Sequence, residues 1–116
     1  MADVRDRTSD QQAISRGVVA IYKDFLGRGP TAASTTITDT FVTTICHDSL
    51  TRAEKRLVEG GDREMVRNMR RRFQQAMSED MIRLVEENTG RRAIGFLSDH
   101  DVDEDVAIET IVLEDG

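Results

Sequence analysis

Residues 27–46, GRGPTAASTTITDTFVTTIC, separate a helical sequence pattern from an extended one. The first four of them hold two glycines and Pro30, the only proline of the chain. Glycine favours the left-handed backbone that ends many helices, and proline cannot continue a helix. Threonine, valine and isoleucine, which suit a pleated surface, dominate residues 31–38 and 40–46. Because a short connection around Asp39 joins these two runs, they predict an antiparallel hairpin.

Helical patterns flank this hairpin on both sides. Upstream, apolar residues recur every three or four positions over residues 14–25, and Ser9 or Asp10 is the expected N-cap. Downstream, residues 51–54, TRAE, match the capping box, in which threonine bonds forward and glutamate bonds back. This motif predicts a short helix that ends at the following Gly-Gly pair.

A long helix and two more strands complete the pattern. The helix is expected to run from its cap Asp62 to about Asn88 and to stop at Gly90. Strands are predicted at Arg92–Leu97 and Val106–Leu113. The order α-β-β-α-α-β-β predicts an α+β fold, with a four-stranded antiparallel sheet packed against helices and one long helix.

The bulk properties fit one soluble domain. The chain has 116 residues, of which 38% are hydrophobic and 33% charged. We expect a single domain over residues 11–113, after a flexible N-terminus over residues 1–10. The net charge of −6 argues against binding to nucleic acid or to anionic membranes. Since no run approaches the ~20 apolar residues of a membrane span and the start is polar, we expect a cytoplasmic protein without direct membrane insertion.

Two features predict a homodimer. The last two strands carry apolar residues on both faces, whereas an antiparallel sheet with one side in water alternates cleanly. One face holds Val106, Ile108 and Val112, and the other holds Ile111 and Leu113. In addition, a helix of about 26 residues spans roughly 39 Å and overhangs a strand of roughly 20 Å. We expect a second copy to cover the excess apolar surface.

Gly27-Arg28-Gly29-Pro30 raises the question of a phosphate-binding loop. Such loops present glycine amides at the start of a helix, where the helix dipole is positive. Here the glycines follow a helix, and their spacing fits neither GxGxxG nor GxxxxGK[ST]. A helix stop explains Gly27 and Pro30, but it leaves Arg28 unexplained.

The sequence predicts no catalytic group and no cofactor. Cys46 is the only cysteine, which excludes an intramolecular disulfide, and its apolar neighbours predict a buried thiol. His47 follows it, but adjacent residues of a strand point to opposite faces. No motif supplies an oriented nucleophile or an oxyanion hole. We therefore expect that the protein is not an enzyme.

The loop predicted at residues 98–105, SDHDVDED, has the alternating carboxylates of a calcium loop. However, Glu104 stands where an EF-hand needs glycine, and Thr110 stands where it needs a bidentate glutamate. A solvated hairpin turn is the main interpretation. A looser metal site that uses His100 and two aspartates is the alternative.

Four arginines share one face of the predicted long helix: Arg63, Arg67, Arg70 and Arg71. They indicate either a solvated face balanced by nearby acids or a docking surface for carboxylates. The carboxylates would belong to an acidic partner or to the Asp-rich loop of a neighbouring subunit.

Four segments together resemble a known family. They are IYKDFLGRGPTAASTTITD, LTRAEKRLVEGG, VRNMRRRFQQAM and GRRAIGFLSDHDVDEDVAIETIVL. Their order and spacing are similar to those of the MpsC-like family of small prokaryotic proteins, over roughly residues 11–113. The family is named for a Na⁺-translocating, membrane-potential-generating system linked to inorganic-carbon uptake, so the resemblance implies an association with membrane subunits.

These observations lead to one main hypothesis and one alternative. The main hypothesis is a soluble, dimeric binding or adaptor protein, an accessory subunit of a membrane cation or inorganic-carbon transport system. The alternative is a regulatory protein with a small-ligand or metal site between the GRGP turn and the SDHD loop. The candidate ligand-binding or interface residues are Arg28, Gly29, Pro30, Asp99, His100 and Asp101.

Overall fold

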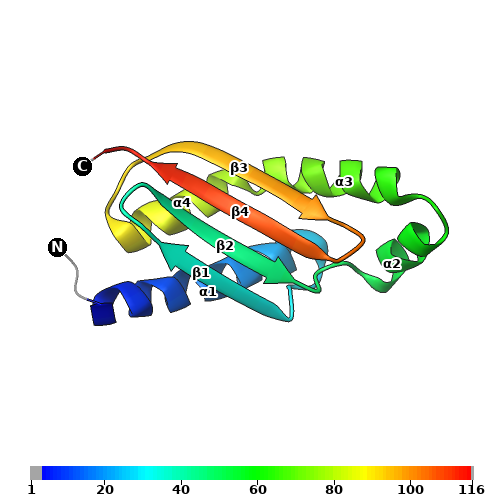
Figure 1. The fold of residues 1–116 in the computed structure, drawn as a ribbon, viewed down its shortest axis with the longest axis horizontal. Coiled ribbons are helices and arrows are strands. Elements are labelled where there is room, and N and C mark those ends of the chain that lie inside the picture. The colour runs from blue at the N-terminus through cyan, green and yellow to red at the C-terminus, as the bar shows by residue number, and fades with distance from the viewer. Residues whose placement is uncertain (1–3, 116) are drawn as a thin grey trace.

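The computed structural model describes residues 4–115, with side chains from Arg7 onward. Within this range the chain forms helices and strands in an α+β arrangement (Figure 1). The elements are α1 (Val4–Leu26), β1 (Ala32–Ile37), β2 (Phe41–His47), α2 (Arg52–Glu59), α3 (Arg63–Ala76), α4 (Ser78–Thr89), β3 (Ala93–Asp101) and β4 (Val106–Leu113). The predicted fold class and four-stranded antiparallel sheet are confirmed.

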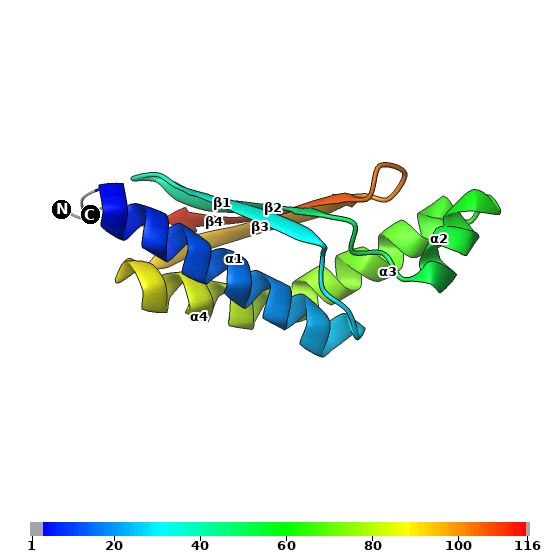
Figure 2. The same ribbon diagram turned by 90° about the horizontal axis from the view of Figure 1, so that it is seen from below.

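The sheet has the strand order β1-β2-β4-β3, and every neighbouring pair is antiparallel. Figure 2 shows α1, α3 and α4 on one side of the sheet and no helix on the other side. We call the uncovered side of β2, β3 and β4 the open face. Its residues are Phe41, Thr43, Ile45, His47, Leu97, Asp99, Asp101, Val106, Ile108, Thr110 and Val112.

The two-sided apolar character predicted for the last strand is confirmed. Ile111 and Leu113 are buried in the main core under the helices. Ile108 lies on the open face beside Ile45, with which it is paired in the β2–β4 register, and it is 39% exposed. One face of β4 therefore fills the core, and the other leaves apolar groups uncovered.

Several helix ends lie where the sequence predicted them from backbone requirements. Gly27, directly after α1, has φ 85°, which only glycine adopts without strain. The capping box of α2 forms in both directions between Thr51 and Glu54. Gly90 ends α4 in the left-handed conformation. The start of α1 was predicted wrongly, because the helix begins at Val4 and not near Ser9 or Asp10; residues 1–3 of the predicted flexible terminus lie outside the described residues.

The predicted long helix is in fact two helices that meet at Met77. Met77 is fully buried in the main core, and its N–H donates to the carbonyl of Phe73. Figure 2 shows that the chain bends there, so that α4 lies along α1 and α3 runs toward the far end of the sheet. The predicted cap Asp62 makes no side-chain capping bond.

The far half of α3 does extend beyond the sheet, but residues of the same chain pack against it. A second core cluster, formed by Leu50, Val66 and Val102 with Val58 beside it, fills this end of the molecule. The helix overhang that suggested a second copy is therefore covered by residues of the same chain. Of the two features that predicted a homodimer, only the uncovered apolar face of the sheet remains.

The acidic segment was also assigned wrongly at its start. Strand β3 continues through Asp101, so Ser98–Asp101 are extended residues paired with β4. Only residues 102–105 form the turn, and Asp105 closes it with φ 54°. Because side chains alternate along a strand, Asp99 and Asp101 point one way and His100 points the other.

Candidate functional site

Arg28 makes contacts that account for its position. Its guanidinium donates to the carbonyl oxygens of Leu50 and, at 2.7 Å, of Asp48. It also lies 3.6 Å from the Asp48 carboxylate. Asp48 has φ 58°, so the backbone turns sharply between β2 and α2. Arg28 thereby joins the corner after α1 to the corner after β2.

His100 holds the same corner from the opposite side. Its imidazole has no exposed surface, and Nε2 lies 2.9 Å from Asp105 Oδ1, to which it donates. The second carboxylate oxygen of Asp105 accepts the N–H of Leu50 at 3.1 Å. Burial raises the pKa of Asp105, but bonds from His100 and from backbone amides outweigh this and hold that pKa below its usual range.

A buried ion pair supports this corner from below. Arg70 donates through Nε and one terminal nitrogen to the Glu54 carboxylate, at 2.8 and 2.7 Å, and to the carbonyl of Ser49 at 2.8 Å. The side chains of Arg70 and Glu54 are 1% and 8% exposed. Burial raises the pKa of Glu54, but bonds from Arg70 and Thr51 hold it below its usual range. The sequence pattern placed Arg70 on one helix face with three other arginines. Because Arg70 is buried, it does not belong to a solvated arginine face.

We call residues 48–51 the corner segment. Arg28 comes from the GRGP segment, Glu54 from LTRAEK, Arg70 from VRNMRRRF, and His100 from FLSDH. Segments that are far apart in the sequence thus converge on one short stretch of backbone. Arg28, Glu54 and Arg70 bond it directly, and His100 reaches it through Asp105. The predicted candidates Arg28 and His100 are linked indirectly. Arg28 bonds the corner segment, and His100 bonds Asp105, which accepts the N–H of Leu50 in that segment.

Gly29 and Pro30 have local packing roles. A Cβ on Gly29 would lie 2.8 Å from a methyl group of Val19 and 2.9 Å from its carbonyl oxygen, so no larger residue fits without a shift. Pro30 is buried. Both residues therefore bring the chain close against α1 before it enters β1.

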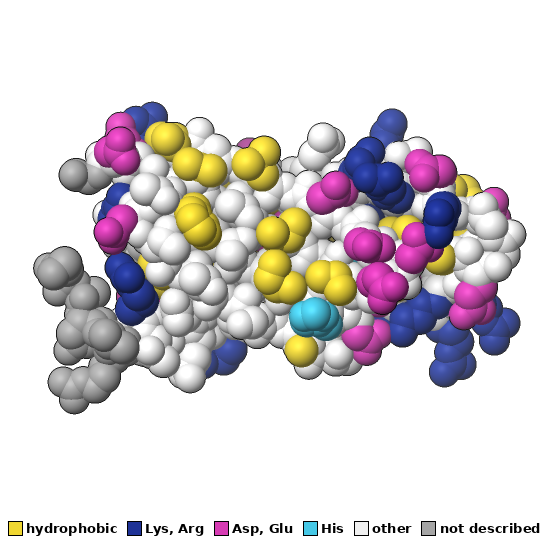
Figure 3. Space-filling model, viewed as in Figure 1, with side chains coloured by type: hydrophobic (Ala, Val, Ile, Leu, Met, Phe, Trp, Pro, Cys, Tyr) yellow, Lys and Arg dark blue, Asp and Glu magenta, His cyan; other side chains and the backbone are white. Residues whose placement is uncertain are grey.

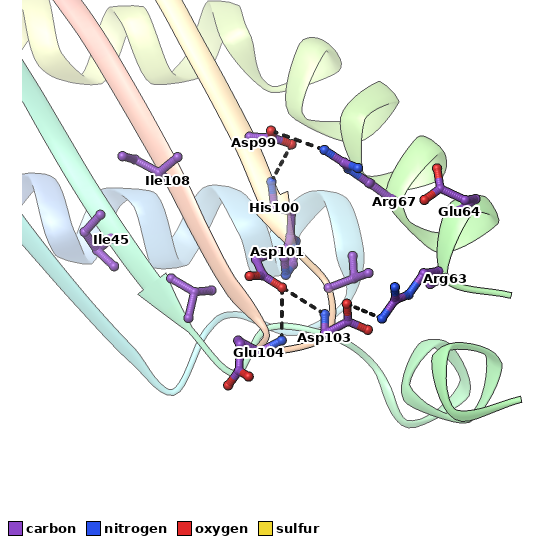
Figure 4. Close-up of a pocket in the computed structure, with 12 residues that line it drawn as sticks. Ile45, Arg63, Glu64, Arg67, Asp99, His100, Asp101, Asp103, Glu104 and Ile108 are labelled. Carbon is purple, nitrogen blue, oxygen red and sulfur yellow. Dashed lines mark hydrogen bonds and ion pairs between the residues drawn. The ribbon is translucent and has the colours of Figure 1, made fainter. Parts of the chain in front are cut away.

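The remaining candidates border a groove of about 710 Å³ between the β3–β4 turn and α3 (Figure 4). Asp99 lies 3.8 Å from Arg67 and 3.5 Å from Arg71, and Arg63 pairs with Asp103. A hydrogen bond from the His100 amide, followed by the two arginines, lowers the pKa of Asp99 despite partial burial.

Asp101 has a local role in the turn, since its Oδ1 accepts the N–H groups of Asp103 and Glu104, each at 3.1 Å. The exposed arginines of α3 thus form ion pairs with the Asp-rich segment of the same chain, which is the partner that the sequence analysis placed in a neighbouring subunit. Among residues 4–115, no group of three or more His, Cys, Asp or Glu side chains is arranged to hold a metal ion. Residues 27–30 do not line the groove.

A buried polar cluster that the sequence reasoning missed lies under the sheet. Glu109 is 1% exposed, and its Oε1 accepts from the Tyr22 hydroxyl at 2.8 Å and from Gln74 Nε2 at 2.9 Å. Gln74 Nε2 also donates to the Asp99 carbonyl at 3.0 Å. Within the described part of the chain, Glu109 Oε2, Gln74 Oε1 and His100 Nδ1 have no partner.

Burial raises the pKa of Glu109 to about 7, although the bonds from Tyr22 and Gln74 oppose this rise. Burial and then the Glu109 charge raise the pKa of Tyr22 and also that of Cys46, which reaches about 12. The strand pattern held a signal for this cluster, because alternation places Glu109 on the face of Ile111 and Leu113. A carboxyl group in an apolar row indicates a buried polar contact.

Replacing Arg28 is expected to destabilise the corner segment. Arg28→Ala removes the donors of two backbone carbonyls and should lower the free energy of unfolding by about 1.5–3 kcal/mol. Urea unfolding followed by far-UV circular dichroism measures this loss. The matched control is Arg72→Ala, since Arg72 is exposed. An equal effect of both substitutions would contradict the assigned role of Arg28.

The fold and the site define a small two-layer α+β protein whose polar segments are used to hold its own backbone and whose sheet has one uncovered face. The model of the family described as "Na+-translocating membrane potential-generating system (MpsC)" matches residues 6–115, so the chain belongs to the MpsC family. Comparisons with curated proteins and with solved structures gave no significant match. None of the described helices is long and apolar enough to cross a bilayer.

Proposed function

We propose that the chain is a homodimeric accessory subunit of a Na⁺-translocating membrane system and acts by binding a membrane subunit of that system. The observation that carries this proposal is the family match, which spans residues 6–115. The family description names a system that generates a membrane potential. A chain of 116 residues with no described membrane-spanning helix suits a subunit that binds such a system rather than one that conducts the ion.

The contacts of the polar side chains support a binding role and not an enzymatic one. Arg28 is engaged with the corner segment and His100 with Asp105, and the Glu109 carboxyl is shielded from solvent. By contrast, the open face presents exposed apolar groups, which mark interaction sites on soluble proteins. We propose a cytoplasmic location, with attachment to the membrane through the partner, in a system for cations or inorganic carbon.

The proposal is tested in cells of the source organism in which the gene for this chain is deleted. The expected result is a smaller Na⁺-dependent membrane potential, measured with a voltage-sensitive dye in media with Na⁺ or K⁺ as the main cation. A plasmid copy of the gene should restore it, and a tagged copy should retain Na⁺-translocating membrane subunits after detergent extraction. An unchanged potential together with no retained membrane subunit would reject the proposal.

A second candidate, a small-ligand or ion site, is favoured by the groove beside Asp99 and Asp101. The groove is about 710 Å³ and combines carboxylates with Arg63 and Arg67. A thermal-shift screen with bicarbonate, Na⁺ and divalent cations tests it. A rise in Tm with one of these ions, lost in Asp99→Asn, would favour this candidate over the accessory-subunit proposal.

A further inference from the structure

The open face is an apolar feature that the fold of the chain leaves uncovered. Large exposed apolar side chains of the described residues gather on it: Phe41, Leu97 and Ile108 are 36%, 66% and 39% exposed, and Ile94 beside them is 59% exposed. We propose that this face is the homodimer interface, covered by the same face of a second copy of the chain. The inference rests on the homodimer of the proposed function and assigns its interface.

The low charge of the open face favours a second copy as the occupant. Only two of its eleven residues are charged, Asp99 and Asp101 next to the β3–β4 turn, although 33% of the chain is charged. Figure 3 shows the apolar side chains over the strands and the charged ones gathered toward the ends of the molecule. Two copies with a net charge of −6 repel each other, so they approach best through a surface of low charge. A basic partner would instead meet the acids near the β3–β4 turn.

The shape and size of the face also suit a sheet-on-sheet dimer. Its three strands of 7–9 residues, at about 3.4 Å per residue and about 4.8 Å spacing, give a flat area of roughly 400 Å², and β1 beside them brings the uncovered side of the sheet to roughly 500 Å². The relief of side chains increases the accessible area toward the roughly 800 Å² per partner that stable interfaces bury. Two twisted sheets pack about 10 Å apart with strands rotated by about 30°, which leaves room for Ile and Val side chains.

Charged groups beside the face are already paired within the chain. Arg63 pairs with Asp103, and Arg67 and Arg71 lie close to Asp99. These pairs are partly exposed and form a polar border at one end of the open face. Figure 4 shows the pairs made by Arg63 and Arg67. Because these pairs need no partner from outside, a second copy can cover the apolar centre without breaking them. Asp101, which accepts backbone N–H groups of the turn, is exposed at the turn end of the face.

The test compares two variants of the open face with a control elsewhere. Ile108→Glu places a charge at the centre, and Leu97→Lys places one at the most exposed apolar position. Met65→Lys, at a 53% exposed position on α3, is the control. Light scattering after size exclusion should give twice the chain mass of 13.0 kDa for the wild type and the control. Both variants should give 13.0 kDa, with a dimer dissociation constant raised roughly 100-fold or more.

Circular dichroism and thermal melting establish that each variant folds, and Leu97→Lys keeps the test decisive if Ile108→Glu does not. If the wild type is a dimer and folded Leu97→Lys also remains one, this interface is wrong while the dimer of the proposed function stands. If the wild type is a monomer at all accessible concentrations, both fail. If the wild type is a monomer and the variants lose only the membrane subunit, the face binds that subunit and not a second copy.

Discussion

Arg70→Ala is expected to lower the free energy of unfolding by roughly 3–5 kcal/mol, because it leaves the Glu54 carboxylate buried without its cation. Arg70 and Glu54 are 1% and 8% exposed and share two hydrogen bonds. The guanidinium also bonds the carbonyl of Ser49, so the corner segment loses a donor as well. Urea unfolding followed by far-UV circular dichroism gives the midpoint and slope.

Arg71→Ala is the matched control, since it makes the same change one residue further along α3. The Arg71 side chain is 47% exposed and faces a 50% exposed Asp99, so its loss should cost below about 1 kcal/mol. Adding Glu54→Gln to Arg70→Met should recover part of the stability, because the glutamine amide oxygen keeps the capping bond to Thr51 without the charge. Equal effects of Arg70→Ala and Arg71→Ala would contradict the buried ion pair.

These two neighbours also show what the sequence could predict and what it could not. Both are arginines in the run VRNMRRRF, so residue type alone does not distinguish them. Helical spacing separates them, because Arg70 follows Val66 by four residues and precedes Met77 by seven, on the buried stripe. This spacing is a signal of burial that the sequence analysis did not use, because it placed Arg70 on one face with the three other arginines of the helix. The spacing could not identify Glu54 as the partner, since that contact depends on how α2 packs against α3.

Element ends were predictable where the backbone itself requires a residue type. Gly27 and Gly90 adopt positive φ, and the capping box is a contact over three residues. The division of the long helix was not predictable in this way. Met77 is compatible with helix on both sides, and the bend follows from packing in the main core, where α4 lies against α1. One such contact is the approach of Leu84 to Gly17, where a Cβ would lie 2.4 Å from a Leu84 methyl group.

The candidate site was predictable as a set of residues but not as a set of contacts. Arg28 could be recognised as a charge that a helix stop does not need. Its acceptors lie at Asp48 and Leu50, 20 and 22 residues further along the chain. Such partners are fixed by the fold, so the sequence identified the side chain and left its function open. The same holds for His100, whose partner Asp105 lies across the turn.

Glu109→Gln is expected to stabilise the protein above pH 7 by roughly 3 kcal/mol and to change little near pH 4.5. The folded pKa of Glu109, about 7, exceeds the ordinary value of 4.5. The folded state therefore binds more protons between these values, so the penalty for ionising Glu109 is absent below pH 4.5. It grows as the pH rises toward 7 and is complete above it, which gives roughly 3 kcal/mol from a difference of about 2.5 pH units.

A glutamine at position 109 also suits the site, because its NH₂ group replaces Glu109 Oε2, which has no hydrogen-bond partner. Gln74 Oε1 is a buried acceptor without a donor, on a side chain that already bonds Glu109 at 2.9 Å. A proton on the carboxyl, or the NH₂ of a glutamine, is the donor that this acceptor lacks. The measurement is the difference in unfolding free energy between Glu109→Gln and the wild type from about pH 4.5 to about pH 8.5. The histidines, present in both proteins, cancel in that difference. If the difference in unfolding free energy does not change with pH, the prediction is wrong, because Glu109 then ionises in the folded protein without a free-energy cost.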